Sequence, residues 1–156
     1  MANISEKVPD VCCEERGRTS LVGVVAGDGE GAMVANQQEL VIRVVAMPAD
    51  TNSSGDIFGG WLLSQMDLAA WVCARKLTPH RLVTVALDGV VFHKPVYVGD
   101  CLLCYATVER IGRTSITIHV LAHAERAKGG EEVAVTEGRF TLVALDSDRN
   151  PTAIQG

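Results

Sequence analysis

Aromatic residues are scarce in this sequence: Phe, Trp and Tyr together make up 4% of its 156 residues. The chain is nevertheless 47% hydrophobic, so it has enough apolar material for one domain with a buried core. That core must consist mainly of Val, Leu, Ile and Ala. Because β-branched residues favour strands, the Val-rich second half of the chain predicts a sheet.

Positive charge is also in short supply. The formal net charge is −5 and the isoelectric point is about 5.3. Proteins that bind nucleic acids present basic surfaces to the phosphates, so we expect no nucleic-acid partner. A small anionic ligand would have to bind at a local basic cluster.

The sequence lacks any uncharged apolar stretch of about twenty residues, so we expect no transmembrane helix and no membrane partner. The apolar run LVGVVAG at residues 21–27 is too short, and too poorly flanked, for a secretory signal. We therefore expect a cytoplasmic protein. An Asn-x-Ser sequon begins at Asn52, but it has no meaning for glycosylation without a secretory signal.

A paired cysteine pattern is missing as well. The five cysteines are odd in number and irregularly spaced, which argues against a disulfide framework and favours a reducing compartment. Two of them, Cys101 and Cys104, would point to opposite faces of a strand, and no second pair lies nearby. We expect no metal site.

Residues 1–36 show no sustained periodicity and are predicted to be a flexible extension, followed by one domain at 37–146 and a tail at 147–156. A short β-branched run from Glu39 ends at Pro48 and predicts a strand. Residues 57–77 are apolar on nearly every side, which is typical of a buried helix. At about 1.5 Å per residue this helix spans roughly 30 Å.

Four segments after the helix are β-branched or alternate between apolar and polar residues, which predicts long antiparallel strands. They are residues 82–92, 101–111, 114–123 and 133–145, with turns at 111–113 and 128–131. A helix that is apolar all round needs a curved sheet wrapped about it. Trp61 and Trp71 on that helix indicate that its remaining side meets a partner subunit.

The polar loop before the helix, DTNSSGDIFGG at residues 50–60, contains the candidate chemistry. Asp56 has two readings from spacing alone: an N-cap of the helix, or a carboxylate that acts in catalysis. The free amides at a helix N-terminus can stabilise an oxyanion. We expect Asp50 to be a solvated loop residue and Asp67, on the helix, to be a structural group or a secondary participant.

Residues 44–70, VVAMPADTNSSGDIFGGWLLSQMDLAA, closely resemble the small acyl-CoA thioesterases of the YciA-like type, which have the hotdog fold. Residues 81–106 and 112–120 resemble the same family, and the likeness covers about 39–145. It implies an α+β hotdog fold, in which a curved antiparallel sheet wraps a long central helix. It also implies hydrolysis of an acyl-CoA thioester, with CoA as part of substrate and product and no other cofactor. Such proteins form homodimers, commonly assembled into hexamers as trimers of dimers, with each site between two subunits.

The resemblance favours Asp56 as general base or nucleophile. Asn52 would help to orient water or the carbonyl, and the Gly59 and Gly60 amides would form the oxyanion hole. The residues expected to bind CoA are Thr84, Val85, His93, Lys94, Arg113, Thr114 and Ser115.

Two rival functions stay open. His93 resembles the histidine of a hotdog hydratase or dehydratase, whose carboxylate partner would have to come from the helix, where only Asp67 is available. The other rival is a non-catalytic acyl-CoA sensor. The sequence has no Gly-x-Ser-x-Gly motif, which argues against an α/β-hydrolase mechanism for the same reaction.

Overall fold

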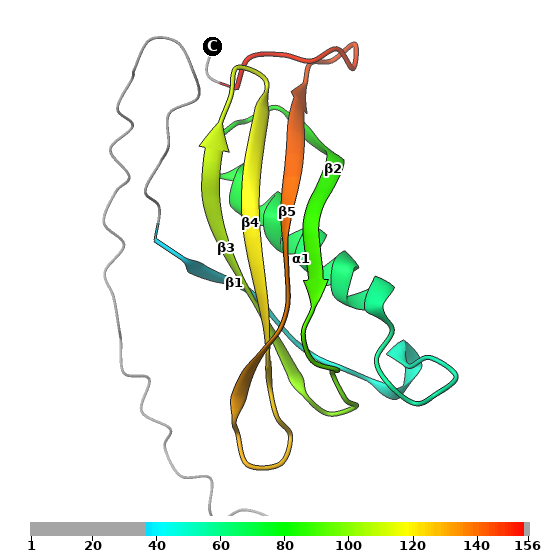
Figure 1. Ribbon diagram of the computed structural model, residues 1–156. Coiled ribbons are helices and arrows are strands. Elements are labelled where there is room, and N and C mark those ends of the chain that lie inside the picture. The colour runs from blue at the N-terminus through cyan, green and yellow to red at the C-terminus, as the bar shows by residue number, and fades with distance from the viewer. Residues whose placement is uncertain (1–36, 155–156) are drawn as a thin grey trace, which may run out of the picture.

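The computed structural model describes residues 37–154, which form one helix and a five-stranded antiparallel sheet (Figure 1). The extension predicted at residues 1–36 lies outside the described residues. The elements are β1 (Glu39–Val45), a 3-10 turn (Pro48–Asp50), α1 (Gly59–Arg75), β2 (Arg81–Phe92), β3 (Cys101–Ile111), β4 (Ser115–Glu125) and β5 (Glu132–Leu145).

The strand order across the sheet is β1-β3-β4-β5-β2, and every neighbouring pair is antiparallel. The three strands joined by hairpins lie in the centre, while β1 and β2 form the two edges. The long strands twist and curve about α1, which lies across one face of the sheet (Figure 1). The α+β arrangement predicted from the periodicity is confirmed.

The core lies between this face and α1. In β4 burial alternates residue by residue: Ile116, Ile118 and Val120 are fully buried, while the side chains between them lie on the outer face. Phe140 from β5 and Met66 from α1 are among the largest side chains with no exposed surface. Scarcity of aromatic residues is thus met by a core built mainly of aliphatic side chains.

The helix buries one side only. Its buried residues include Ala69, Ala70 and Ala74, whose small side chains let the helix approach the sheet closely. On the other side Leu68 is 51% exposed and Trp71 is 40% exposed. The sequence predicted a helix that is covered on all sides. Within one chain, the sheet covers only one side of α1.

The segment predicted to be a C-terminal tail folds back onto the sheet. The N–H of Thr152 donates to the Ala144 carbonyl, and the N–H of Ile154 donates to the Arg113 carbonyl, both at 2.9 Å. Ile154 is buried and belongs to the core cluster. No helix within residues 37–154 is long and apolar enough to cross a membrane.

Candidate active site

Asn52 organises the loop that leads into α1. Its side-chain Oδ1 accepts the N–H groups of Ser54 at 2.9 Å and of Asp56 at 3.2 Å. Its own N–H donates to the Asp56 carbonyl at 2.7 Å. Gly55 has a φ of +87°, which a residue with a side chain rarely adopts, so the loop requires glycine there. The loop is therefore closed on itself around one amide side chain.

Two further contacts attach this loop to its surroundings. The N–H of Ile57 donates to the Val96 carbonyl at 3.1 Å, and the N–H of Phe58 donates to the Asp50 carbonyl at 2.8 Å. The Asp50 carboxylate also accepts the Met47 N–H at 3.0 Å. The expectation that Asp50 is merely solvated is wrong, because both its carbonyl and its carboxylate hold the loop in place.

The Asp56 carboxylate is half-buried and has no hydrogen-bond partner among residues 37–154. The N-cap position belongs to Phe58, and no side chain caps the helix. The structural interpretation of Asp56 as an N-cap is therefore wrong. The loop holds both the N–H and the carbonyl of Asp56, through Asn52, while the Asp56 carboxylate has no partner among the described residues.

Among the described residues, the first two N–H groups of the helix are unpaired, and the next two are paired. The N–H groups of Trp61 and Leu62 both donate to the Phe58 carbonyl, at 3.0 Å and 3.3 Å. No acceptor for the N–H groups of Gly59 and Gly60 is found within the described part of the chain. A Cβ at position 59 would lie in ordinary van der Waals contact with the Phe92 ring, at 3.4 Å, so β2 packs directly beside this end of the helix. These amides, at the positive end of the helix dipole, are suited to hold an anionic oxygen.

Asp67 is the second carboxylate of the region, and it is oriented. The Thr84 hydroxyl of β2 donates to Asp67 Oδ1 at 2.6 Å, while Oδ2 has no partner among the described residues. Both side chains are half-buried, beside the exposed stripe of α1 formed by Ser64, Leu68 and Trp71. Asp67 thus combines a fixed orientation with a free oxygen. Thr84 was predicted as a contact to CoA, and its role in orienting Asp67 was missed.

His93 pairs with a carboxylate that sequence reasoning did not consider. Its Nε2 lies 2.9 Å from Glu137 Oε1, and His119 Nε2 lies 3.4 Å from the other oxygen of Glu137. The hydrogen bond from His93, together with the contact from His119, lowers the pKa of Glu137. The expectation that a partner for His93 must come from the helix is wrong, because period-2 alternation on β5 places Glu137 on the outer face beside it.

The remaining residues predicted to bind CoA do not lie together in one chain. Val85, at a bulge of β2, is 57% exposed, and the Lys94 side chain is also exposed. Arg113 is exposed in the β3–β4 turn, which closes through the Gly112 N–H and the Ser115 carbonyl at 2.7 Å. This turn lies at the opposite end of the sheet from the loop before α1 (Figure 1). At about 3.3 Å per residue, β3 separates the two by roughly 35 Å.

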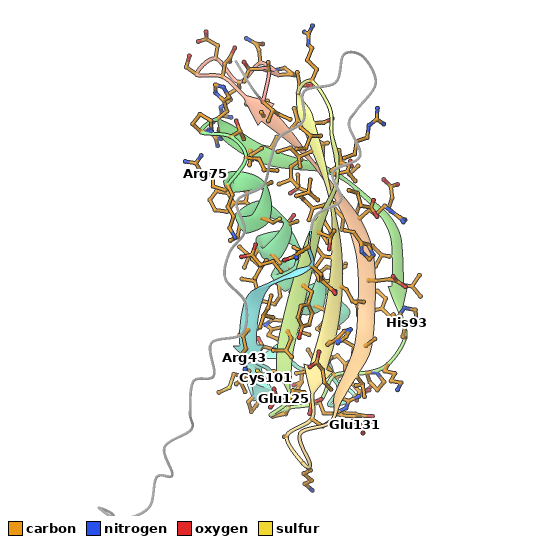
Figure 2. All side chains as sticks on the ribbon, turned by 90° about the vertical axis from the view of Figure 1, so that its left-hand side faces the viewer. Arg43, Arg75, His93, Cys101, Glu125 and Glu131 are labelled. Atoms are coloured by element: carbon orange, nitrogen blue, oxygen red, sulfur yellow. The ribbon has the colours of Figure 1, made fainter. Side chains whose placement is uncertain are left out.

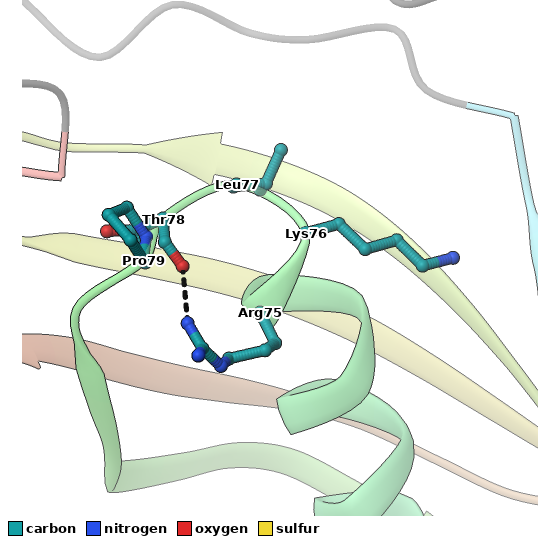
Figure 3. Close-up of a pocket in the computed structure, with 5 residues that line it drawn as sticks. All are labelled: Arg75, Lys76, Leu77, Thr78 and Pro79. Carbon is teal, nitrogen blue, oxygen red and sulfur yellow. Dashed lines mark hydrogen bonds between the residues drawn. The ribbon is translucent and has the colours of Figure 1, made fainter.

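An open hollow of about 530 Å³ is lined by residues 75–79, where α1 ends (Figure 3). Arg75 donates to the Thr78 carbonyl across it, at 3.0 Å. Arg75 and His93 lie toward opposite ends of the molecule (Figure 2). The hollow therefore does not contain the carboxylates or the free amides described above.

The cysteines among residues 37–154 are free, and two of them, Cys73 and Cys104, are buried. Cys104 has no exposed surface, and burial raises its pKa to about 12. It therefore stays protonated and is inert as a nucleophile at neutral pH. No cluster of three or more metal-ligating side chains occurs within this part of the chain.

A single helix wrapped by a curved antiparallel sheet, with free amides and two carboxylates at the helix, defines an α+β protein with a site suited to acyl transfer. Residues 54–131 match the family described as the thioesterase superfamily. The chain belongs to this superfamily, and its hotdog fold, predicted from the sequence, is confirmed.

Individual relatives agree with this assignment. The chain is 45% identical over 118 residues to the acyl-CoA thioester hydrolase YciA of Salmonella typhimurium, covering 74% of this chain and 89% of that protein. It is similar to the crystal structure of a hexameric thioesterase from Yersinia pestis, with 46% identity, a TM-score of 0.71 and coverage of 74% and 94%. A hexameric hotdog fold thioesterase of Campylobacter jejuni matches with 43% identity, a TM-score of 0.69 and coverage of 74% and 90%.

Proposed function

We propose that this protein hydrolyses acyl-CoA thioesters to a free acid and CoA. Relatives that are 42–45% identical to it over about three quarters of the chain are named for this activity. Thioester hydrolysis needs a group that activates water or attacks the carbonyl, donors for the oxyanion, and a grip on CoA. The described residues offer candidates for all three.

The carboxylate is the first part of the proposal. Asp56 was predicted for this role from the sequence, and its unpaired carboxylate directly before the helix still supports it. The observation that carries our proposal furthest, however, is the Thr84 hydrogen bond to Asp67 at 2.6 Å. A base held by a neighbouring group on a rigid helix is better positioned than one on a loop. We assign the role of general base or nucleophile to Asp67 and keep Asp56 as the alternative.

The chemistry balances in either mode. As general base, the carboxylate takes one proton from water while the hydroxide oxygen bonds to the thioester carbon. The C–S bond then breaks, and the carboxyl returns its proton to the leaving CoA thiolate. As nucleophile, it forms a mixed anhydride as the CoA thiolate leaves, and water then hydrolyses that anhydride. In both modes the developing oxyanion lies against the Gly59 and Gly60 amides. Loss of one such donor costs about 10²–10³ in rate.

Asn52 completes the proposed site. Its Oδ1 is used by the loop, but its Nδ2 has no partner among the described residues. That amide can donate to the thioester carbonyl or to the attacking water. Asn52 thus supports the loop with one atom and leaves the other for substrate.

Asp67 and the free amides require a second copy of the chain. Asp67 follows Gly60 by seven positions, which is about 10 Å along the helix axis, so the two cannot act on one carbonyl within a chain. Strand β2 pairs with β5 on one side, and its outer edge has no neighbouring strand among residues 37–154. Most of its exposed side chains are apolar: Val85, Leu87, Val91 and Phe92 are 44–57% exposed. We propose that two chains pair through β2 and pack the exposed sides of their helices together. Antiparallel pairing sets the start of one β2 against the end of the other.

The same pairing explains the divided CoA site. The β3–β4 turn lies at the end of the sheet where β2 begins, since Thr114 bonds to Ala144 and Arg81 pairs with Leu145. A two-fold axis brings that turn of one chain toward the loop before α1 of the other. Arg113, with the Thr114 and Ser115 hydroxyls, is proposed to bind phosphate there. His93, Lys94, Thr84 and Val85 line the path between. Because similar structures are hexamers, we propose three such dimers per assembly.

The proposal is tested with the purified protein and a panel of acyl-CoA esters, by following thiol release with DTNB. Since His93 pairs with Glu137, hydration of an enoyl-CoA is measured in parallel. We expect thiol release without hydration, and His93→Ala should weaken turnover rather than abolish it. Hydration that depends on His93 would favour the hydratase. Tight binding of CoA esters without turnover would establish a sensor.

A further inference from the structure

Asp100 is a buried carboxylate that the proposed mechanism does not use. It is 3% exposed at the start of β3, and it accepts the N–H groups of Tyr97 at 3.0 Å and of Ala127 at 3.2 Å. Its third partner is the Arg126 guanidinium. A buried ion pair contributes little net stability, because desolvation offsets the attraction. Its placement therefore needs another reason.

Arg126 and Asp100 together clamp the connection between β2 and β3. The Arg126 guanidinium also donates to the Pro95 carbonyl at 3.0 Å, and it lies 5.0 Å from the centre of the Tyr97 ring. Pro95 and Tyr97 are the two neighbours of Val96. Arg126 holds the peptide group before Val96, and Asp100 holds the one after it. The Val96 carbonyl belongs to the second peptide group, so the ion pair fixes its orientation.

That carbonyl is the attachment point of the site loop. It accepts the Ile57 N–H at 3.1 Å, and both Val96 and Ile57 are buried, at 1% and 5% exposed. Because both residues are buried, water cannot readily replace this bond if it is lost. Asp100 also accepts the Ala46 N–H on its carbonyl, at 2.9 Å, where the chain enters the loop.

We propose that Asp100 and Arg126 are positioning residues for the segment of residues 52–60, acting through the Val96 carbonyl. The inference rests on the proposed function, because this segment carries Asn52 and the Gly59 and Gly60 amides. Neither residue touches the substrate. Their ion pair sets where the free amides point when the thioester carbonyl arrives.

The test compares Asp100→Asn and Arg126→Gln with Glu125→Gln as control. Glu125 is adjacent in sequence and pairs with Arg43 at 2.7 Å, but its side chain is 37% exposed and does not contact the clamp. Figure 2 shows Arg43 and Glu125 close together at this end of the sheet. For each variant, kcat and KM are measured by thiol release, and exchange of the Ile57 amide is followed by hydrogen exchange.

In the clamp variants we expect kcat to fall about 10–100-fold with KM little changed, as a misplacement of about 1 Å produces. The Ile57 amide should exchange faster, whereas amides in the middle of β4 should not. Arg126→Lys, which keeps the charge, should recover part of kcat, and Glu125→Gln should match the wild type. If Asp100→Asn does not fold, Arg126→Gln and Arg126→Lys decide.

Folded clamp variants with unchanged kcat would overturn the inference, whether or not Ile57 exchange changes. So would a loss of kcat without faster Ile57 exchange. Asp67→Asn, assayed alongside, separates this failure from that of the proposed function. Full turnover of Asp67→Asn counts against the catalytic assignment and leaves the clamp to be judged by its own variants.

Discussion

Asn52 shows how one side chain can have two tasks at the residue scale. Its Oδ1 closes the loop, while its Nδ2 faces no partner in the described part of the chain. Asn52→Ala should remove both the Oδ1 acceptor and the Nδ2 donor. Asn52→Asp keeps an acceptor for the loop and loses the donor.

We expect kcat to fall about 10²–10³-fold in both variants, because each loses a donor to the reacting oxygen. Only Asn52→Ala should also speed exchange of the Ser54 and Asp56 amides. The two measurements are steady-state thiol release and hydrogen exchange. Wild-type kcat in Asn52→Asp would show that Nδ2 has no part in the reaction.

Asp100 makes a prediction about acid stability. Burial alone would raise the pKa of its carboxyl, but the hydrogen bonds from the Tyr97 and Ala127 N–H groups and the Arg126 ion pair outweigh burial and lower the pKa. The ionised form therefore stabilises the fold above the unfolded value of about 4, and this stabilisation is lost as the pH falls through the folded pKa.

In urea unfolding at pH 7, Asp100→Asn should lose about 3 kcal/mol, because it leaves Arg126 partly buried without its partner. The difference between wild type and variant should shrink as the pH is lowered below 4, where the wild-type carboxyl takes up its proton. An equal difference at pH 7 and at pH 3 would contradict this account.

At the same scale, the sequence pointed to the loop that carries the candidate site but not to every contact around it. Residues 50–60 stand out because small polar residues precede an apolar run. The contacts of Thr84 and Glu137 depend on residues far along the chain, at Asp67 and His93, so no local pattern contains them. The contacts of Asp50 are local, to Met47 and Phe58, but sequence reasoning missed them. A Gly-Asp pair such as Gly99-Asp100 is typical of an ordinary turn, and no local pattern near it points to Arg126.

At the scale of elements, α1 has a buried side and an exposed side with different energetic roles. Met66 has no exposed surface, so Met66→Ala should lower the free energy of unfolding by about 2–5 kcal/mol. Leu68 is 51% exposed, so in a dissociated chain Leu68→Ala should lower the free energy of unfolding far less. Urea unfolding of both variants, measured on dissociated chains, checks this, and equal losses there would contradict the one-sided burial of α1.

The periodicity of apolar residues predicted the elements well, because apolar residues recur where side chains are buried. In β4 they alternate because one face of the strand is buried, and in α1 they include the residues that pack on the sheet. The helix start was predicted two residues early, at 57, since no capping side chain marks it and Phe58 occupies the cap. Which half of the helix surface stays uncovered was not readable, because apolar residues occur on both sides.

At the scale of the whole molecule, we propose that activity depends on assembly. Leu87 lies on edge strand β2 and is 44% exposed. Leu87→Lys should place a charge in the proposed contact between two chains, dissociate the assembly and lower kcat with it. Leu40→Lys, on the opposite edge and 43% exposed, is the matched control for the dimer contact. Sedimentation and thiol release are measured on both, and an intact dimer in Leu87→Lys would contradict pairing through β2.

The divided site is what the sequence alone could not place. The β3–β4 turn, which carries Arg113, and the loop before α1 lie at opposite ends of one sheet (Figure 1), so the CoA site that we propose needs a second copy of the chain. The family resemblance implied a site between subunits, and the unpaired β2 edge gives that implication a physical basis.

The central claim is that Asp67, a carboxylate on α1 held by Thr84, carries out thioester hydrolysis. Asp67→Asn and Asp56→Asn are compared by DTNB thiol release, with sedimentation to show that each variant assembles. We expect Asp67→Asn to lose at least about 10³-fold in kcat while it still binds CoA, and Asp56→Asn to lose much less. Wild-type turnover in Asp67→Asn would contradict the account, and a large loss in Asp56→Asn alone would return the role to the carboxylate predicted from the sequence.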